Sequence, residues 1–144
     1  MQRLIFRIQV HAPADNVWET LWNEGTYRIW NSVIEKGSYA ESEWLEGGKV
    51  WFLSPKGNGL SSIIEKKVPG QLMVFRHLGV VVNKTEQPDD PRSREWVGLR
   101  QYFKLERING KTELSIEMDA TDDYAPFFSE VFPEALKKIK TLTE

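Results

Sequence analysis

The chain has 144 residues, no cysteine and a formal charge of −2 at pH 7, with its basic side chains spread along the sequence. A nucleic-acid-binding domain normally concentrates basic charge, so this composition argues against a nucleic-acid partner. The absence of cysteine excludes disulfides, thiolate metal sites and a cysteine nucleophile. No apolar run approaches the roughly 20 residues that cross a bilayer, and the N-terminal residues lack the apolar stretch of a signal peptide. We therefore expect a single cytoplasmic domain over residues 1–144, without membrane insertion.

The N-terminal segment predicts a strand followed by two short helices. Apolar and polar residues alternate over residues 3–11, which indicates a strand with one apolar face. Pro13 suits the first turn of a helix, where its missing N–H would have no partner. Apolar residues then recur at helical spacing over residues 13–23. Gly25 ends this helix, and we expect a short helical turn at residues 26–30.

The middle of the chain is typical of antiparallel strands. Turn signals recur at short spacing and separate runs that we predict as strands at 38–45, 49–54, 60–68, 71–82, 95–107 and 111–121. Asn109-Gly110 predicts a tight hairpin, because both central residues of a type I′ turn need positive φ. The last two strands alternate cleanly, so one face of the sheet should meet water. Residues 83–95 hold two prolines and no large apolar side chain, which predicts a mobile loop between strands.

The C-terminal residues 124–143 predict a long helix with a broad apolar stripe. Pro133 lies inside this stripe, and proline removes a hydrogen bond from a helix interior. We therefore expect the first part of the helix to be irregular.

This order of elements predicts an α+β helix-grip fold. In that fold a seven-stranded curved antiparallel sheet wraps around the long C-terminal helix, with two short helices between the first and second strands. A straight helix does not fill a curved sheet completely, so the gap between them should be an apolar ligand cavity.

Several stretches support this expectation by resemblance. Residues 8–18, IQVHAPADNVW, resemble the opening of the START-like (SRPBCC, Bet v-like) superfamily. Its Aha-type branch, named for activators of a heat-shock chaperone ATPase, is similar in further features: Trp30, Glu46-Gly47-Gly48, Gly59 before a strand ending in Val68-Pro69, and a C-terminal helix ending in Leu-Lys-Lys-Ile-Lys. The resemblance covers nearly the whole chain. It implies the helix-grip fold and often an apolar cavity, but no universal catalytic motif.

No motif in the sequence assigns a reaction, a metal or a cofactor. The two histidines, His11 and His77, lie far apart and form no zinc-binding spacing. Nucleophile-elbow, P-loop and dinucleotide-binding glycine patterns are absent. Two adjacent acidic pairs, Asp89-Asp90 and Asp122-Asp123, are explained by solvation or helix capping. We therefore name no catalytic residue.

Two polar residues fall on apolar strand segments. His77 lies in a strand with apolar residues on both faces, so its register is open. If Phe75 points inward, His77 does too and becomes a polar anchor or general base; in the other register Arg76 points inward. Gln101 shares an apolar face with Leu99 and Phe103, and its amide must find a partner in the protein, in water or in a ligand.

The leading hypothesis is a binding or carrier domain for an apolar or lipid-like small molecule. The candidate cavity residues are Trp30, Phe52, Ile64, Phe75, His77, Gln101, Phe103, Met118, Phe128 and Phe132. One alternative is a START-like enzyme of the cyclase or hydrolase type, with His77 as base. Another is a chaperone-cofactor-like interaction module or a homodimer, with an exposed patch around Trp51 or Trp96.

Three of the six tryptophans lie at positions 18, 22 and 30. Trp18 falls on the apolar stripe of the first helix, and Trp22 lies at its edge. Trp30 follows the glycine break, in the segment that closes one end of the cavity in helix-grip folds. We interpret Trp18 as a core anchor, Trp22 as its flank and Trp30 as a gatekeeper for the ligand.

Overall fold

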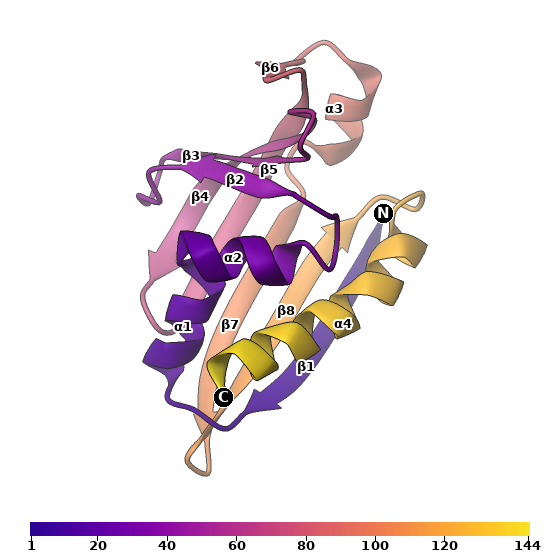
Figure 1. Cartoon of the computed structure of the whole chain (residues 1–144). Helices are drawn as coiled ribbons and strands as arrows, with labels where there is room; N and C mark the ends of the chain where they lie inside the picture. Colours follow the sequence, from indigo (N-terminus) through magenta and orange to yellow (C-terminus); the bar gives the residue numbers. More distant parts are fainter.

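The computed structural model describes residues 1–144 as one antiparallel sheet and four helices (Figure 1). In chain order the elements are β1 (Gln2–Val10), α1 (Ala14–Trp22), α2 (Glu24–Asn31), β2 (Tyr39–Ser42), β3 (Lys49–Leu53), β4 (Gly59–Val68), β5 (Leu72–Val82), β6 (Thr85–Glu86), α3 (Pro91–Trp96), β7 (Arg100–Ile108), β8 (Lys111–Ala120) and α4 (Ala125–Thr143). The strand order is β1-β8-β7-β5-β4-β3-β2, and β6 pairs with β5 alone.

The alternation seen in the sequence sets which face of the sheet is covered. β1 pairs with β8 along its whole length, from Gln2 opposite Ala120 to Val10 opposite Thr112. Leu4, Phe6, Ile8 and Val10 face inward, whereas Ile5, both arginines and both glutamines are exposed. The hairpin between β7 and β8 turns at Asn109-Gly110, where both residues have positive φ, as predicted.

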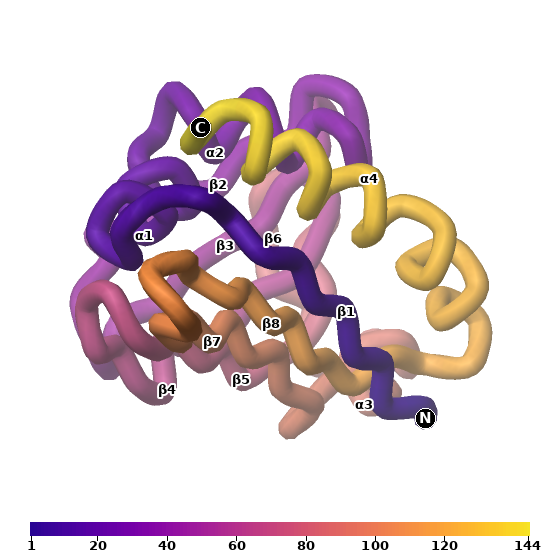
Figure 2. Tube along the Cα trace, turned by 90° about the horizontal axis from the view of Figure 1, so that it is seen from below, coloured from indigo at the N-terminus to yellow at the C-terminus, as the bar shows by residue number.

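The long helix α4 packs across the concave side of this sheet. It contacts β1, α1 and α2, and its buried residues include Phe132, Ala135, Leu136 and Ile139. Figure 2 shows α4 on the opposite side of the molecule from β4, β5 and β7. The predicted helix-grip architecture is therefore confirmed.

Two predictions about local structure are wrong. Residues 83–95 are not a structureless loop, since they contain β6 and most of α3, and the strand expected from residue 95 begins at Arg100. Helix α3 forms because Asp90 caps its N-terminus by accepting from the backbone N–H of Arg92 (2.8 Å), and Pro91 suits the first turn.

The other wrong prediction is the irregular start of the C-terminal helix. Helix α4 runs continuously from Ala125 to Thr143 with Pro133 inside it. The carbonyl that loses its partner belongs to Ser129, which is exposed. Because water can bond that carbonyl, the helix tolerates the proline here.

Candidate ligand-binding cavity

A cavity of about 920 Å³ lies between the sheet and helices α2, α3 and α4. Hydrophobic residues make up 18 of the 31 that line it. It opens to solvent at its exposed charged residues, which are Glu35, Lys56, Arg92, Glu95 and Asp123. This volume lies within the range of about 300–1,000 Å³ that is usual for small-molecule sites.

The structure brings nine of the ten candidate residues to the wall of this cavity. They are Trp30, Phe52, Phe75, His77, Gln101, Phe103, Met118, Phe128 and Phe132. Ile64 is the exception, because its side chain is fully enclosed in the hydrophobic core and does not reach the cavity. Contact of the other nine with a ligand stays a prediction.

Trp22 is the centre of the aromatic wall rather than the flank that the helical pattern indicated. Its ring centroid lies within 4.9–6.5 Å of five other aromatic rings, those of Phe103, Trp44, Phe75, Trp18 and Tyr27. Sequence reasoning missed Trp22 and Tyr27 as lining residues, because both depend on how α2 folds back against α1. The spacing of Tyr27 and Trp30, three residues apart on one helix, was the available signal.

The interpretation of Trp18 as the core anchor is also wrong, while the gatekeeper role of Trp30 stays a prediction. Trp30 is only 2% exposed, and its indole N–H donates to the backbone carbonyl of Leu21 in α1 (3.1 Å). Trp18 is only partly buried at the edge of the core. Trp30 therefore fixes α2 onto α1 while one side of its ring lines the cavity, and Trp18 is the peripheral member.

The structure settles the register of β5. Phe75 and His77 both point inward, and Arg76 points outward to pair with Glu65 (3.2 Å). The partner of Ser61 on β5 is Gly79, whereas the partner of Ser62 is His77, so Leu78 is the extra residue of a β-bulge. Such bulges re-aim the side chains beside them.

His77 is held in place from two sides. Its Nδ1 lies 2.6 Å from the hydroxyl of the fully buried Ser62. The Trp96 ring packs edge to face with the imidazole, and their ring centroids are 5.7 Å apart. No protein atom forms a hydrogen bond with Nε2, and the protein does not fully enclose this atom. Because His77 lines the cavity, Nε2 is its one free hydrogen-bonding atom there.

Burial controls the charge of His77. It lowers the pKa of His77 from 6.5 to about 4, although the carboxylate of Asp119 acts in the opposite direction. Asp119 itself accepts from the guanidinium of Arg3 (2.8 Å) and from the backbone N–H of Arg100 (2.9 Å). It makes no hydrogen bond to His77, so Ser62, His77 and Asp119 do not form a catalytic triad.

Besides the fully enclosed indole N–H of Trp22, two further polar groups on the wall have no partner in the protein. The Gln101 amide is half-buried between Phe75 and Met118, its cross-strand neighbours, and makes no side-chain hydrogen bond. The Tyr27 hydroxyl is likewise unbonded, and burial raises the pKa of Tyr27 well above its ordinary value. Both groups remain available to a molecule in the cavity.

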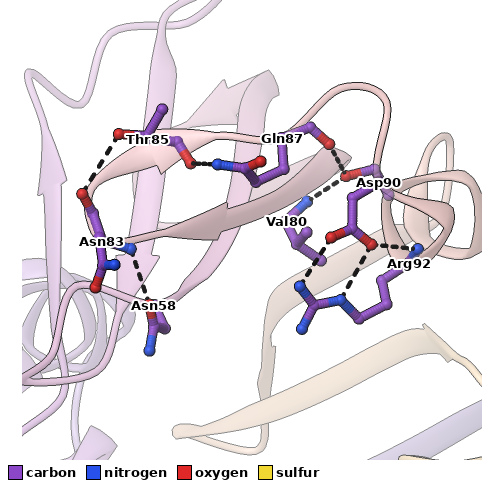
Figure 3. A network of polar contacts seen from close by, with 8 residues as sticks. Asn58, Val80, Asn83, Thr85, Gln87, Asp90 and Arg92 are labelled. Carbon is purple, nitrogen blue, oxygen red and sulfur yellow. Dashed lines mark hydrogen bonds and ion pairs between the residues drawn. The ribbon is translucent and has the colours of Figure 1, made fainter.

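Polar contacts fasten the segment that carries α3 (Figure 3), and this segment contributes Arg92, Glu95 and Trp96 to the cavity lining. Ser93 accepts from the backbone N–H of Val80 (2.9 Å) and donates to the carbonyl of Gln87 (2.6 Å). Ser93 packs directly against Gly79, where a Cβ atom would lie 2.7 Å from its hydroxyl oxygen. The absence of a side chain at Gly79 therefore lets α3 sit on β5.

Neither tryptophan proposed for a contact surface is exposed. Trp96 is only 5% exposed, and Trp51 is half-buried with its indole N–H donating to Glu86 (3.3 Å). These two tryptophans therefore form no exposed patch themselves, although Val97 and Tyr124 beside Trp96 are exposed.

Comparison with known proteins gives the fold. No family model and no curated protein matches the chain. The Aha1 dimer from Colwellia psychrerythraea superimposes with a TM-score of 0.74 at 18% identity, over 100% of this chain and 97% of that one. The chain has the helix-grip fold of that structure. CalU16 from Micromonospora echinospora matches with a TM-score of 0.68 at 15% identity, over 99% of this chain and 76% of that one. DynU16, from the dynemicin biosynthetic locus, matches at 0.70 and 12% identity, over 98% of this chain and 46% of that one.

The structure lacks two further features that would indicate a function, a metal-binding cluster and a membrane-spanning helix. The structure gathers no group of three or more His, Cys, Asp or Glu side chains that could hold a metal ion. None of its helices has the length and apolar character to span a membrane.

Proposed function

We propose that this protein binds a small apolar molecule in the cavity between the sheet and α4. The observation that carries the proposal is the aromatic wall around Trp22, Phe75 and Phe103, which encloses about 920 Å³ open to solvent. Aromatic rings bury large apolar areas with few rotatable bonds, so they suit such a ligand. Proteins of this fold share the arrangement of a sheet around a helix, and that supports the proposal only at the level of the fold.

Binding without catalysis fits the polar groups better than an enzyme does. The inward position of His77 is the feature that a cyclase or hydrolase would need. The low pKa of His77, about 4, makes it a weak base, and its partner Ser62 is fully buried and cannot meet a substrate. Catalysis with His77 as the base stays an alternative, and His77 is the one residue that supports it. The chaperone-cofactor role and a homodimer stay predictions, since the Colwellia Aha1 dimer shares only the fold.

The test is native mass spectrometry of protein purified from its own cells. We expect a bound species that survives gentle ionisation and is lost on denaturation, with a mass suited to a cavity of about 920 Å³. Identical masses in native and denaturing spectra, together with no uptake of the apolar fluorophore pyrene in solution, would refute the proposal.

A further inference from the structure

The cavity wall carries a small polar site on an otherwise apolar stretch of the sheet. Gln101 on β7 lies directly opposite Phe75 on β5, and His77 follows two residues further along β5 on the same face. Diagonal neighbours of this kind have their Cβ atoms somewhat less than about 7–8 Å apart, a distance that one bridging oxygen atom can span between two side chains. The Gln101 amide and the His77 Nε2 can therefore meet the same group of a ligand.

Nothing in the protein competes for these two side chains. The neighbours of Gln101 across the sheet are Phe75 and Met118, which offer no strong hydrogen bond. The imidazole of His77 is fixed by Ser62 and Trp96, so its Nε2 keeps one direction. Neither group is fully enclosed, so water in the cavity can bond both, and a ligand with a matching polar group can replace that water.

The charges around the cavity disfavour an acid as the deep ligand group. The cationic lining residues, Lys56 and Arg92, are exposed at the opening, and Arg92 is paired with Asp90 (2.8 Å). Burial keeps His77 neutral, because a pKa of about 4 leaves roughly one molecule in a thousand protonated at pH 7. A buried carboxylate would therefore have no counter-charge.

The tautomer of His77 narrows the choice among neutral groups. The Ser62 hydroxyl makes no other hydrogen bond, so it can either donate to Nδ1 or accept from it. Nε2 is then a donor in the first case and an acceptor in the second. A hydroxyl group can serve both cases, whereas a carbonyl serves only the first.

We propose that the ligand is a neutral apolar molecule carrying a hydroxyl group, which is bound between the His77 Nε2 and the Gln101 amide. This proposal rests on the proposed function, since it names the ligand class of the same cavity. It assigns His77 and Gln101 to recognition and the aromatic wall to general affinity.

Three fluorescent probes that share one hydrocarbon test the proposal: pyrene, 1-pyrenemethanol and pyrene-1-carboxylate. Energy transfer from the tryptophans of the cavity wall to pyrene reports binding at pH 7. We expect 1-pyrenemethanol to bind about three- to tenfold more tightly than pyrene, the usual effect of one added hydrogen bond. Pyrene-1-carboxylate should bind at least about tenfold more weakly than the alcohol, because its charge is buried without a partner.

Two matched variants locate the effect. In Gln101→Leu the preference for the alcohol over pyrene should fall by at least half, and pyrene itself should bind as before. Gln101 makes no side-chain hydrogen bond, so this substitution leaves no protein group unpaired. The same substitution at the exposed Gln9 of β1, Gln9→Leu, should leave the preference unchanged.

The outcomes separate this proposal from the proposed function. Failure of all three probes to bind would count against the binding function itself. Binding of pyrene with no preference for the alcohol, tighter binding of the carboxylate, or an equal preference in Gln101→Leu and wild type would overturn the hydroxyl site alone.

Discussion

Acidification from pH 7 to pH 5 should destabilise the folded protein by about 2 kcal/mol through His77. In the unfolded chain this imidazole has its ordinary pKa of 6.5, whereas in the folded protein burial lowers the pKa to about 4. Below pH 6.5 the unfolded state binds a proton that the folded state excludes, so stability is present above pH 6.5 and is lost as the pH falls toward 4. At about 1.4 kcal/mol per pKa unit the whole loss is about 3 kcal/mol, of which about 2 falls between pH 7 and pH 5.

Urea denaturation at the two pH values measures this loss. His77→Gln should be less stable than wild type at pH 7, but its free energy of unfolding should no longer fall between pH 7 and pH 5. The exposed His11 provides the control, since His11→Gln should keep the wild-type dependence. The carboxylate of Glu86, whose pKa is lowered by hydrogen bonds from Ser61 and Lys49, titrates below this range. Equal unfolding free energies of wild type at pH 7 and pH 5 would refute the reasoning.

Two further predictions concern packing. Trp30→Ala should lower the free energy of unfolding by about 4 kcal/mol, the usual effect of truncating a buried aromatic ring, whereas Trp18→Ala should lower it by only about 1–2 kcal/mol because Trp18 is partly exposed. Urea denaturation of both variants checks this order, and the reverse order would restore Trp18 as the core anchor. Gly79→Ala should destabilise the protein by about 1–3 kcal/mol, because the added Cβ would lie 2.7 Å from the Ser93 hydroxyl. Hydrogen exchange should then accelerate in α3, and unchanged exchange there would show that α3 accommodates the methyl group.

The fold was predictable because its signals are local. Each signal depends on a few neighbouring residues and indicates one strand or turn, as the alternation in β1, β7 and β8 and the glycines of the turns do. Helix α3 was missed for a different reason. Its cap at Asp90 and its proline at position 91 are helix signals, but a helix of six residues is stable only through tertiary packing. That packing depends on the missing side chain of Gly79, which lies twelve residues earlier in the chain.

The candidate site was predictable in composition but not in geometry. Large apolar residues on the inner face had to surround any gap beneath α4, so most of the predicted residues line it. The orientation of His77 could not be read from the sequence, because residues 72–78 place apolar side chains on both faces of β5. The bulge at Leu78 and the bond to Ser62 settle that orientation, and both arise from pairing with β4.

The same wall that makes the cavity also weakens the protein around it. Protein interiors are normally close-packed, and aromatic rings that face a hollow lose dispersion contacts on one side. Here Trp22, Phe75 and Phe103 pack edge to face with each other and leave that hollow open, while His77 and Gln101 lack partners beside it. A filled core would have been more stable than this arrangement, since the rings would regain those dispersion contacts. A molecule that fills the space restores the same contacts and can bond the two polar groups, so ligand binding and folding stability are coupled through one set of side chains.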